Sequence, residues 1–149
     1  MTISPIIRPI SPADTNAVLD MMRVFYNSPA VHTNGSEDIF RTDIATCLSN
    51  SPYLEGYVFE VNGELGGYAM LAKSFSTEFG KPCVWIEDIY IMENCRGLGI
   101  GTAFLTMIET KYPNAVFRLE VEEENERAVR VYRKCGYDFL PYREMKKEP

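Results

Sequence analysis

The sequence is poor in the residues that usually bind metal ions. It has one histidine and four cysteines among 149 residues, and Cys47, Cys83, Cys95 and Cys135 include no C-x-x-C pair. Zinc sites normally require such closely spaced cysteine or histidine ligands. We therefore expect no bound metal, and we expect the four thiols to stay reduced.

Long apolar segments and an excess of positive charge are also missing. No run of about 18 apolar residues could cross a bilayer, and the first residues lack the basic and apolar regions of a signal peptide. Lysine and arginine number 15 against 21 aspartates and glutamates, for a net charge of -6. A negative protein repels nucleic acid and anionic membranes. These absences predict a cytoplasmic protein that binds neither nucleic acid nor membrane.

The length and the 46% hydrophobic and 24% charged fractions suit a single folded domain spanning residues 1–149. The hydrophobic patterns predict helices and strands in the order β-α-α-β-β-β-α-β-α-β. The expected helices lie within 11–26, 39–50, 103–112 and 125–135. The expected strands are Ile3–Pro9, Tyr57–Val61, Leu65–Ala72, Cys83–Met92, Ala115–Val121 and Tyr137–Met145, the last either one strand or two broken near Pro141. Asn62-Gly63 predicts a tight hairpin turn between the second and third strands.

Two adjacent acids interrupt the apolar strand Cys83–Met92, which we expect to be central. Strand alternation would send Glu87 and Asp88 to opposite faces of the sheet. Buried carboxylates are costly unless they are hydrogen-bonded or face a wet cleft, so at least one should face a pocket. A carboxylate there can accept a proton from an amine, directly or through water, and we take Glu87 as the candidate base. The alternative is an acid satisfied by backbone groups or by an arginine.

A glycine-rich loop, Arg96-Gly97-Leu98-Gly99-Ile100-Gly101-Thr102, joins this strand to the third helix. Glycines allow close approach of a ligand, and a helix N-terminus offers unpaired N–H groups to a phosphate. Thr102 stands where a dinucleotide fingerprint needs its third glycine, and no G-K-[ST] is present. The loop therefore favours a pyrophosphate other than that of NAD or a nucleoside triphosphate, with a ligand-free connector as the alternative.

The last predicted helix carries Asn125 and Tyr132, which are seven residues apart and so share one side of the helix. Asn125 is also a good helix N-cap, and an aromatic residue such as Tyr132 is often simply part of a core.

With both motifs in view, the sequence resembles the GNAT acyl-CoA-dependent N-acetyltransferases over nearly its whole length. The run 96–101 is similar to their R/Q-x-x-G-x-G/A loop, and 125–137 is similar to their N-x-x-A-x-x-x-Y-x-x-x-G-[FY] helix. The segment 86–91 resembles more particularly the diamine and thialysine acetyltransferase branch. The resemblance implies a three-layer α/β (α+β) fold, in which helices flank a mixed, mostly antiparallel, twisted sheet.

The resemblance further implies acetyl-CoA as co-substrate, lying in a V-shaped opening between the fourth and fifth strands. Its pantetheine would pair with the backbone of the fourth strand, and its pyrophosphate would rest on the amides that open the third helix. The implied cofactor-binding residues are Ile89, Tyr90, Ile91, Arg96, Gly97, Leu98, Gly99, Ile100, Gly101, Thr102, Asn125, Ala128 and Tyr132.

The implied reaction is transfer of an acetyl group to a primary amine by direct attack in a ternary complex. A protonated amine cannot attack, so a base must deprotonate it, and the departing thiolate must then be protonated. Glu87 acting through water is the expected base, the N–H of Ile89 would polarise the carbonyl, and Tyr132 is the expected acid. No cysteine needs a covalent role.

The acceptor is less well defined. The acidic excess of residues 1–117 favours a small cationic amine, although a solvated acidic surface explains the same charge. Acetylation of a peptide or protein N-terminus and a non-catalytic acyl-CoA sensor remain alternatives. His32 is expected to be a loop residue. The segment Tyr137–Lys147 is expected to be a strand or a segment completed by a partner in a homodimer.

Overall fold

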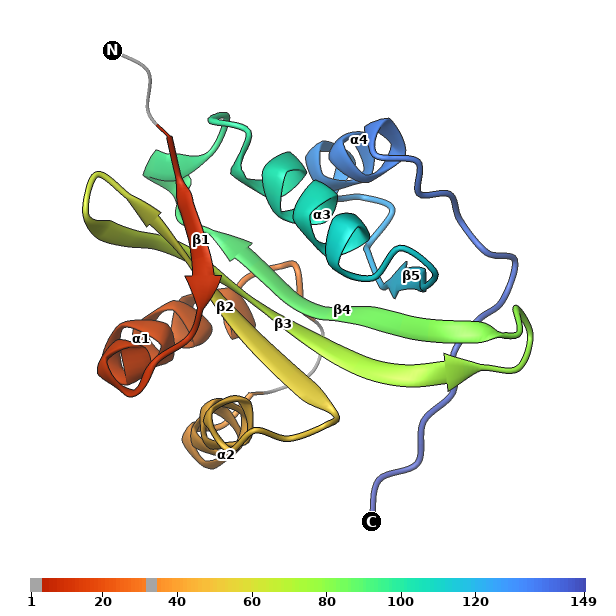
Figure 1. Cartoon of the computed structure of the whole chain (residues 1–149), viewed down its shortest axis with the longest axis horizontal. Coiled ribbons are helices and arrows are strands. Elements are labelled where there is room, and N and C mark those ends of the chain that lie inside the picture. The colour runs from red at the N-terminus through yellow and green to blue at the C-terminus, as the bar shows by residue number, and fades with distance from the viewer. Residues whose placement is uncertain (1–3, 32–34) are drawn as a thin grey trace.

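The computed structural model describes residues 4–31 and 35–149, and its frame is one five-stranded sheet (Figure 1). The strands lie in the order β1-β2-β3-β4-β5, antiparallel except for the parallel pair β4 and β5. Their bounds are β1 Ile6–Pro9, β2 Leu54–Val61, β3 Glu64–Ser76, β4 Lys81–Ile91 and β5 Val116–Leu119. The expected mixed, mostly antiparallel sheet is confirmed, while Ile3 and His32 lie outside the described residues.

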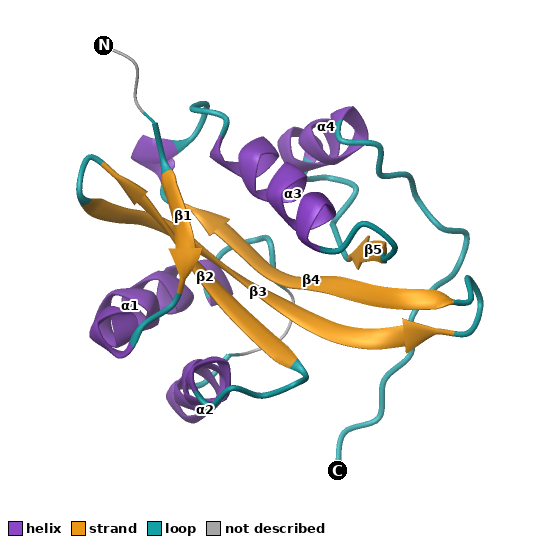
Figure 2. Ribbon diagram, viewed as in Figure 1, coloured by secondary structure: helices purple, strands orange, loops and turns teal. Residues whose placement is uncertain are grey.

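Helices cover both faces of this sheet, which gives three layers (Figure 2). Helices α1 (Thr15–Tyr26) and α2 (Glu37–Leu48) pack on one face, and α3 (Ile100–Lys111) and α4 (Glu126–Lys134) lie on the other. Successive strand residues point to opposite faces, so Val58 joins the core under α1 and α2 while Phe59 joins the core under α3. The predicted fold class is confirmed by this arrangement.

The turn between β2 and β3 forms as its sequence predicts. Asn62 and Gly63 both have positive φ, 55° and 81°, the geometry of a type I′ turn. Val61 and Glu64 pair directly across it. This turn fixes the register of the β2–β3 hairpin.

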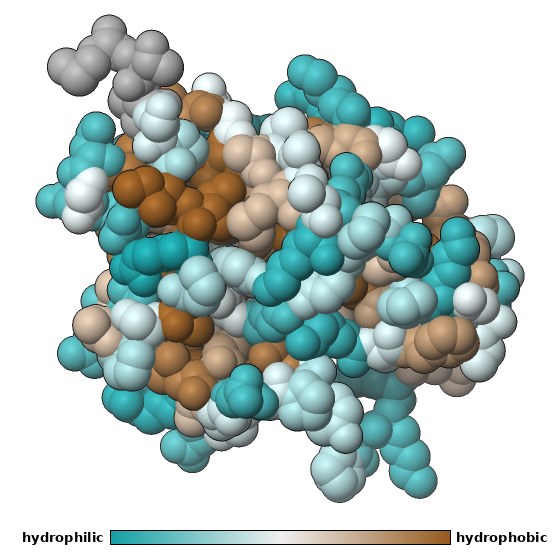
Figure 3. All heavy atoms as spheres, viewed as in Figure 1, coloured by the Kyte–Doolittle hydropathy of each residue, from teal (hydrophilic) through white to brown (hydrophobic). Residues whose placement is uncertain are grey.

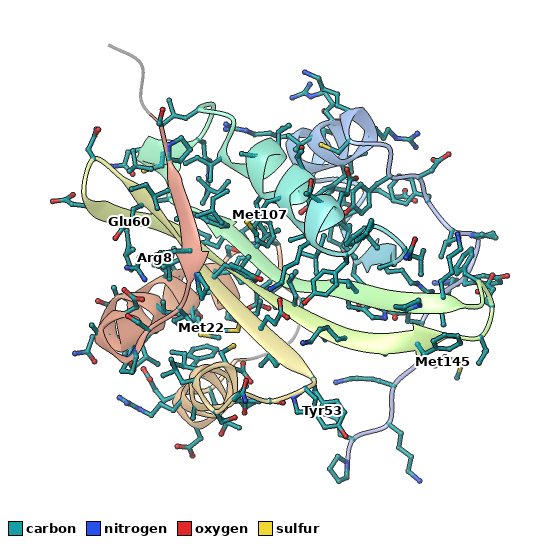
Figure 4. The ribbon with its side chains drawn as sticks, in the orientation of Figure 1. Arg8, Met22, Tyr53, Glu60, Met107 and Met145 are labelled. Carbon is teal, nitrogen blue, oxygen red and sulfur yellow. The ribbon has the colours of Figure 1, made fainter. Side chains whose placement is uncertain are left out.

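An ion-pair network fixes the start of α1. Asp14 accepts hydrogen bonds from the backbone and side chain of Ser11, and it pairs with Arg8 at 2.8 Å. Arg8 also binds Glu60 at 3.1 Å, and Figure 4 shows these two side chains meeting across β1 and β2.

Hydrophobic residues on this view of the surface gather around β1 (Figure 3), where Ile6 is more than half exposed.

A β-bulge in β4 corrects the expectation for the two adjacent acids. Met70 pairs with Asp88 and Leu71 pairs with Ile86, which leaves Glu87 without a partner in β3. The extra residue reverses the alternation, so Asp88 points toward α1 and α2 although Ile86 points toward α3. The bulge therefore breaks the simple alternation on which the expectation of opposite faces rested.

Strands β4 and β5 separate beyond this bulge. They pair only from Cys83 and Val116 to Ile86 and Leu119. No strand of the described chain pairs with the β5 side of Ile89–Ile91. The sheet consequently opens between β4 and β5, next to the loop that leads into α3.

The expected final strand, Tyr137–Met145, does not form, so the predicted order ends at α4. Pro141 lacks a backbone donor, and Phe139, Leu140 and Tyr142 are all at least 42% exposed. Little apolar burial is therefore gained that could fix a strand register. The segment instead contacts the β3–β4 hairpin, where the Tyr142 hydroxyl donates to Glu78 at 3.1 Å.

Candidate active site

A cavity of about 780 Å³ occupies the opening between β4 and β5. Its walls come from five parts of the chain: the end of α1 with the loop after it, the end of β4, the loop into α3 with the first turns of that helix, the segment after β5, and the first turns of α4. Elements distant in sequence thus enclose one space large enough for an extended ligand.

The backbone of the glycine-rich loop adopts a conformation that allows a ligand to approach it closely. Gly97 and Gly99 have φ of 79° and 81°, a region that L side chains rarely adopt, and Gly99 is the N-cap of α3. No side chain caps α3, so the first N–H groups of the helix have no intrahelical partner. Those groups and the positive end of the helix dipole suit an anion.

Arg96 fastens this loop to the end of β4. Its Nε donates to the carbonyl of Ile91 at 3.0 Å, and both residues line the cavity. Leu98 is 40% exposed and does not line the wall. Its predicted contact with a cofactor therefore depends on its backbone amide.

Helix α4 presents the second motif to the same cavity. Asn125 is the N-cap, and its Oδ1 accepts from the amide of Ala128 at 3.3 Å, as the capping interpretation predicts. Asn125, Ala128 and Tyr132 all line the cavity. Burial raises the pKa of Tyr132 to about 12, so its hydroxyl stays protonated at neutral pH.

The two acids of the bulge are not equivalent. Asp88 is 5% exposed and accepts hydrogen bonds at 2.8 Å from Tyr26 and Tyr68, one on each oxygen. Glu87 is exposed and has no hydrogen bond or ion pair with any residue in 4–31 or 35–149. Although the side chain of Glu87 reaches solvent, the surrounding chain displaces part of the water around its carboxylate and raises its pKa, and the charges of Asp88 and Glu144 add to the rise. Asp88 is thus engaged in structure, whereas Glu87 is free to exchange a proton.

The structure brings most of the predicted site residues together. Twelve of the thirteen residues implied for the cofactor, Tyr132 among them, line the cavity. Glu87 and Leu98 lie outside that wall. The cavity wall thus includes the expected acid, Tyr132, and does not include the expected base, Glu87.

Sequence reasoning missed several residues of the cavity wall. Arg127 in the first turn of α4 lines it, with Nη2 4.0 Å from the place where a Cβ on Gly97 would lie. Its position two residues after Asn125 is the sequence signal that could have identified it as part of the wall. Phe25 and the segment 28–31 also contribute, and only tertiary packing brings the end of α1 to this cavity.

Two further features are absent from residues 4–31 and 35–149. These residues include no group of three or more histidine, cysteine, aspartate or glutamate side chains able to hold a metal ion. None of the helices that they form combines the length and the apolar character needed to cross a bilayer.

Comparison with known proteins places this geometry in a family. Residues 17–137 match the acetyltransferase (GNAT) family. A thialysine N-ε-acetyltransferase of Mus musculus is 36% identical over 77 residues, which cover 50% of this chain and 45% of that protein. An uncharacterised N-acetyltransferase of Methanocaldococcus jannaschii is 34% identical over 85 residues, covering 54% and 51%. The chain thus spans about half the length of these curated relatives.

The fold is shared with a solved acetyltransferase. The aminoglycoside N-acetyltransferase AAC(6′)-Iy, in complex with CoA, superposes with a TM-score of 0.79, covering 99% of this chain and 97% of that one at 12% identity. The resemblance inferred from the two sequence motifs is confirmed. The chain belongs to the acetyltransferase (GNAT) family.

Proposed function

We propose that this protein transfers the acetyl group of acetyl-CoA to a primary amine of a small cationic acceptor. One observation carries the proposal: the positive-φ loop Gly97–Gly99, the unpaired side of Ile89–Ile91 and the Tyr132 side chain border one cavity. When bound, acetyl-CoA supplies a thioester that is activated for attack by an amine. The names of the two curated relatives agree with an amine acceptor.

The residues present fit the parts of acetyl-CoA. The N–H groups that open α3 and the glycines before them suit its pyrophosphate. The β5 side of Ile89–Ile91 has no partner strand and suits the amide groups of pantetheine. Arg96 and Arg127 add positive charge to the same wall.

The face around Glu87 suits a positively charged acceptor. Burial, followed by the charges of Asp88 and Glu87, raises the pKa of Asp43 to about 6. Burial and a hydrogen bond with Glu144, with a smaller contribution from the charge of Glu87, raise the pKa of Glu120 to about 7. These raised values mark a region of negative potential, and a bound ammonium group would be stabilised there.

Three groups of the chain would then share the chemistry. Glu87, whose raised pKa makes it a stronger base, accepts a proton from the ammonium through water. The N–H of Ile89 stabilises the oxyanion that develops on the attacked carbonyl. Tyr132, protonated at neutral pH, donates its proton to the departing thiolate.

The test is release of free CoA thiol with polyamines, amino acids, aminothiols and short peptides, with acetyl-CoA binding followed by thermal shift. We expect turnover of one class of small cationic amine, and a large loss of kcat in Glu87→Gln. Glu64→Gln, at an exposed position of β3, is the control and should keep activity. Binding without turnover would support the sensor, and preferred turnover of peptides would support a peptide N-acetyltransferase.

A further inference from the structure

A second hollow lies beside the end of the β3–β4 hairpin, between this hairpin and β5. Its volume is about 320 Å³, and its lining includes Ser74, Ser76, Thr77, Glu78, Trp85 and Arg118. Figure 1 shows the C-terminal segment running past this hairpin. No residue lines both this hollow and the cavity between β4 and β5, so the two spaces have different walls.

Arg118 is the unusual group in this hollow. Its guanidinium lies over the Trp85 ring, 4.6 Å from the centroid. Its Nε is buried and has no hydrogen-bond partner, and no carboxylate among residues 4–31 and 35–149 forms an ion pair with it. A buried donor without an acceptor is costly, and a cation without a counter-ion adds to that cost. An anion bound in the hollow would satisfy both requirements.

Hydroxyl groups on the hairpin indicate the shape of this anion. Ser76 is 8% exposed, and its Oγ accepts from the amide of Phe79 at 3.3 Å, so its own hydrogen can still be donated. Ser74 and Thr77 carry further hydroxyls in the same wall. A guanidinium can bind both oxygens of a planar carboxylate by itself. A tetrahedral oxyanion has further oxygens that can accept from the hairpin, so phosphate or sulfate fits this set of donors better.

Glu78 distinguishes between these two oxyanions. Its Oε2 accepts from the hydroxyl of Tyr142 at 3.1 Å, and no residue of the described chain donates to its Oε1. A carboxylate repels a fully deprotonated anion, but it can accept a hydrogen bond from an anion that keeps an O–H. Hydrogen phosphate has one O–H at neutral pH, whereas sulfate has none. The wall therefore favours hydrogen phosphate.

We propose that this hollow is a binding site for free hydrogen phosphate. Arg118 and the hairpin hydroxyls donate to the phosphate oxygens, and Glu78 accepts the phosphate O–H. The bound ion joins β5 to the β3–β4 hairpin and stabilises the folded chain, because only the folded chain brings these donors together. This inference does not depend on the acetyl-transfer proposal, since none of these residues lines the active-site cavity.

The experiment measures phosphate and sulfate binding by isothermal titration calorimetry near neutral pH. The N-terminus of α3 also suits phosphate, so each titration is run with and without excess CoA. We expect the wild-type protein to bind phosphate at least about tenfold more tightly than sulfate, with or without CoA. Arg118→Gln should weaken phosphate binding by about 10- to 100-fold, the usual effect of losing hydrogen bonds from a charged group.

Glu78→Gln tests the selectivity separately from the affinity. It removes the negative charge and adds a donor, so sulfate should bind more tightly and the preference for phosphate should fall to about threefold or less. Glu64→Gln, at an exposed position of β3, is its control and should keep the wild-type preference. Methyl phosphate, which has lost its O–H near neutral pH, should bind the wild-type protein as weakly as sulfate.

Arg133→Gln is the matched control for Arg118→Gln. Arg133 also lies over an aromatic ring, 5.3 Å from the centroid of Phe139, but it pairs with Asp138 and lies outside the hollow. Its substitution should leave phosphate binding unchanged. Arg118→Lys keeps the charge and loses the planar fork, so it should bind phosphate with intermediate affinity. It provides a second variant if circular dichroism shows that Arg118→Gln folds poorly.

Three results would contradict the proposal. Phosphate binding that excess CoA abolishes would belong to the glycine-rich loop. Phosphate binding that is unchanged in both Arg118 variants would exclude the hollow. Equal affinity of the wild-type protein for phosphate, sulfate and methyl phosphate would exclude recognition of the O–H by Glu78. Each result leaves the proposed acetyl transfer intact, because that proposal is tested by CoA release.

Discussion

Tyr26 at the end of α1 donates its hydroxyl hydrogen to Asp88 of β4 at 2.8 Å. Tyr68 of β3 donates to the other oxygen of the same carboxylate at the same distance. One buried acid therefore joins a helix to two strands, directly beside the bulge that presents Glu87. We infer that Asp88 positions the bulge and that Glu87, the residue before it, is left to act as the base.

Removal of this hydrogen bond should cost stability. Tyr26→Phe leaves one oxygen of a buried acid without a donor, and we expect the free energy of unfolding to fall by about 1–3 kcal/mol. Urea denaturation followed by circular dichroism measures the change. Tyr137→Phe is the contrasting control, because the Tyr137 hydroxyl is buried without a hydrogen-bond partner. Its removal should be neutral or stabilising, and a loss equal to that of Tyr26→Phe would contradict this account.

The Arg8–Asp14 pair predicts a stability change in acid. The hydrogen bond from Arg8 lowers the pKa of Asp14 from 3.8 to about 2, so the folded state favours the charged carboxylate. This stabilisation is complete above pH 3.8 and is lost as the pH falls from 3.8 through 2. Melting temperatures across this range should therefore fall more steeply for the wild-type protein than for Asp14→Asn. Parallel curves for the two proteins would show that the pair does not contribute.

Tyr132→Phe should separate catalysis from cofactor binding. The variant keeps the ring in the cavity wall but removes the proposed proton donor, and we expect kcat to fall by about 10²–10⁴-fold with little change in KM for acetyl-CoA. Tyr53→Phe is the control, since Tyr53 is 72% exposed and points away from the sheet (Figure 4). An unchanged kcat in Tyr132→Phe would assign thiolate protonation to another group.

Two glycines with similar backbones offer a matched test of the phosphate loop. Gly99 and Gly80 have φ of 81° and 63°, and an added Cβ would meet no protein atom within 4 Å at either position. Substitution by alanine should cost each variant about 1 kcal/mol of stability through strain in the left-handed region. Only Gly99→Ala should also raise KM for acetyl-CoA, because its Cβ would stand where the pyrophosphate approaches. Equal KM values for the two variants would argue against this loop as the pyrophosphate site.

Local sequence patterns were sufficient where the determining interactions are themselves local. Asn62-Gly63 specifies its turn by backbone preference, and Ser11 and Asp14 specify the start of the first helix through a capping box. The glycine-rich loop and the Asn125 cap were likewise recognisable from spacing alone. For these reasons the order of elements through α4 and half of the cavity wall, twelve of its 24 residues, could be predicted.

Tertiary structure decided the features that depend on distant partners. The bulge at Glu87 arises from register with Met70 and Leu71, so alternation along β4 alone gave the wrong face. The segment after α4 had a strand-like pattern, yet with Pro141 in it and its apolar side chains exposed it pairs with no strand. Arg118 belonged to an ordinary strand pattern, and its missing partner became visible only when Trp85 and Glu78 were placed around it. Turns and helix caps depend on neighbouring residues, so the sequence alone determines them. The register of a strand, the face to which its side chains point and the absence of a hydrogen-bond partner depend on residues that come together only in the folded chain.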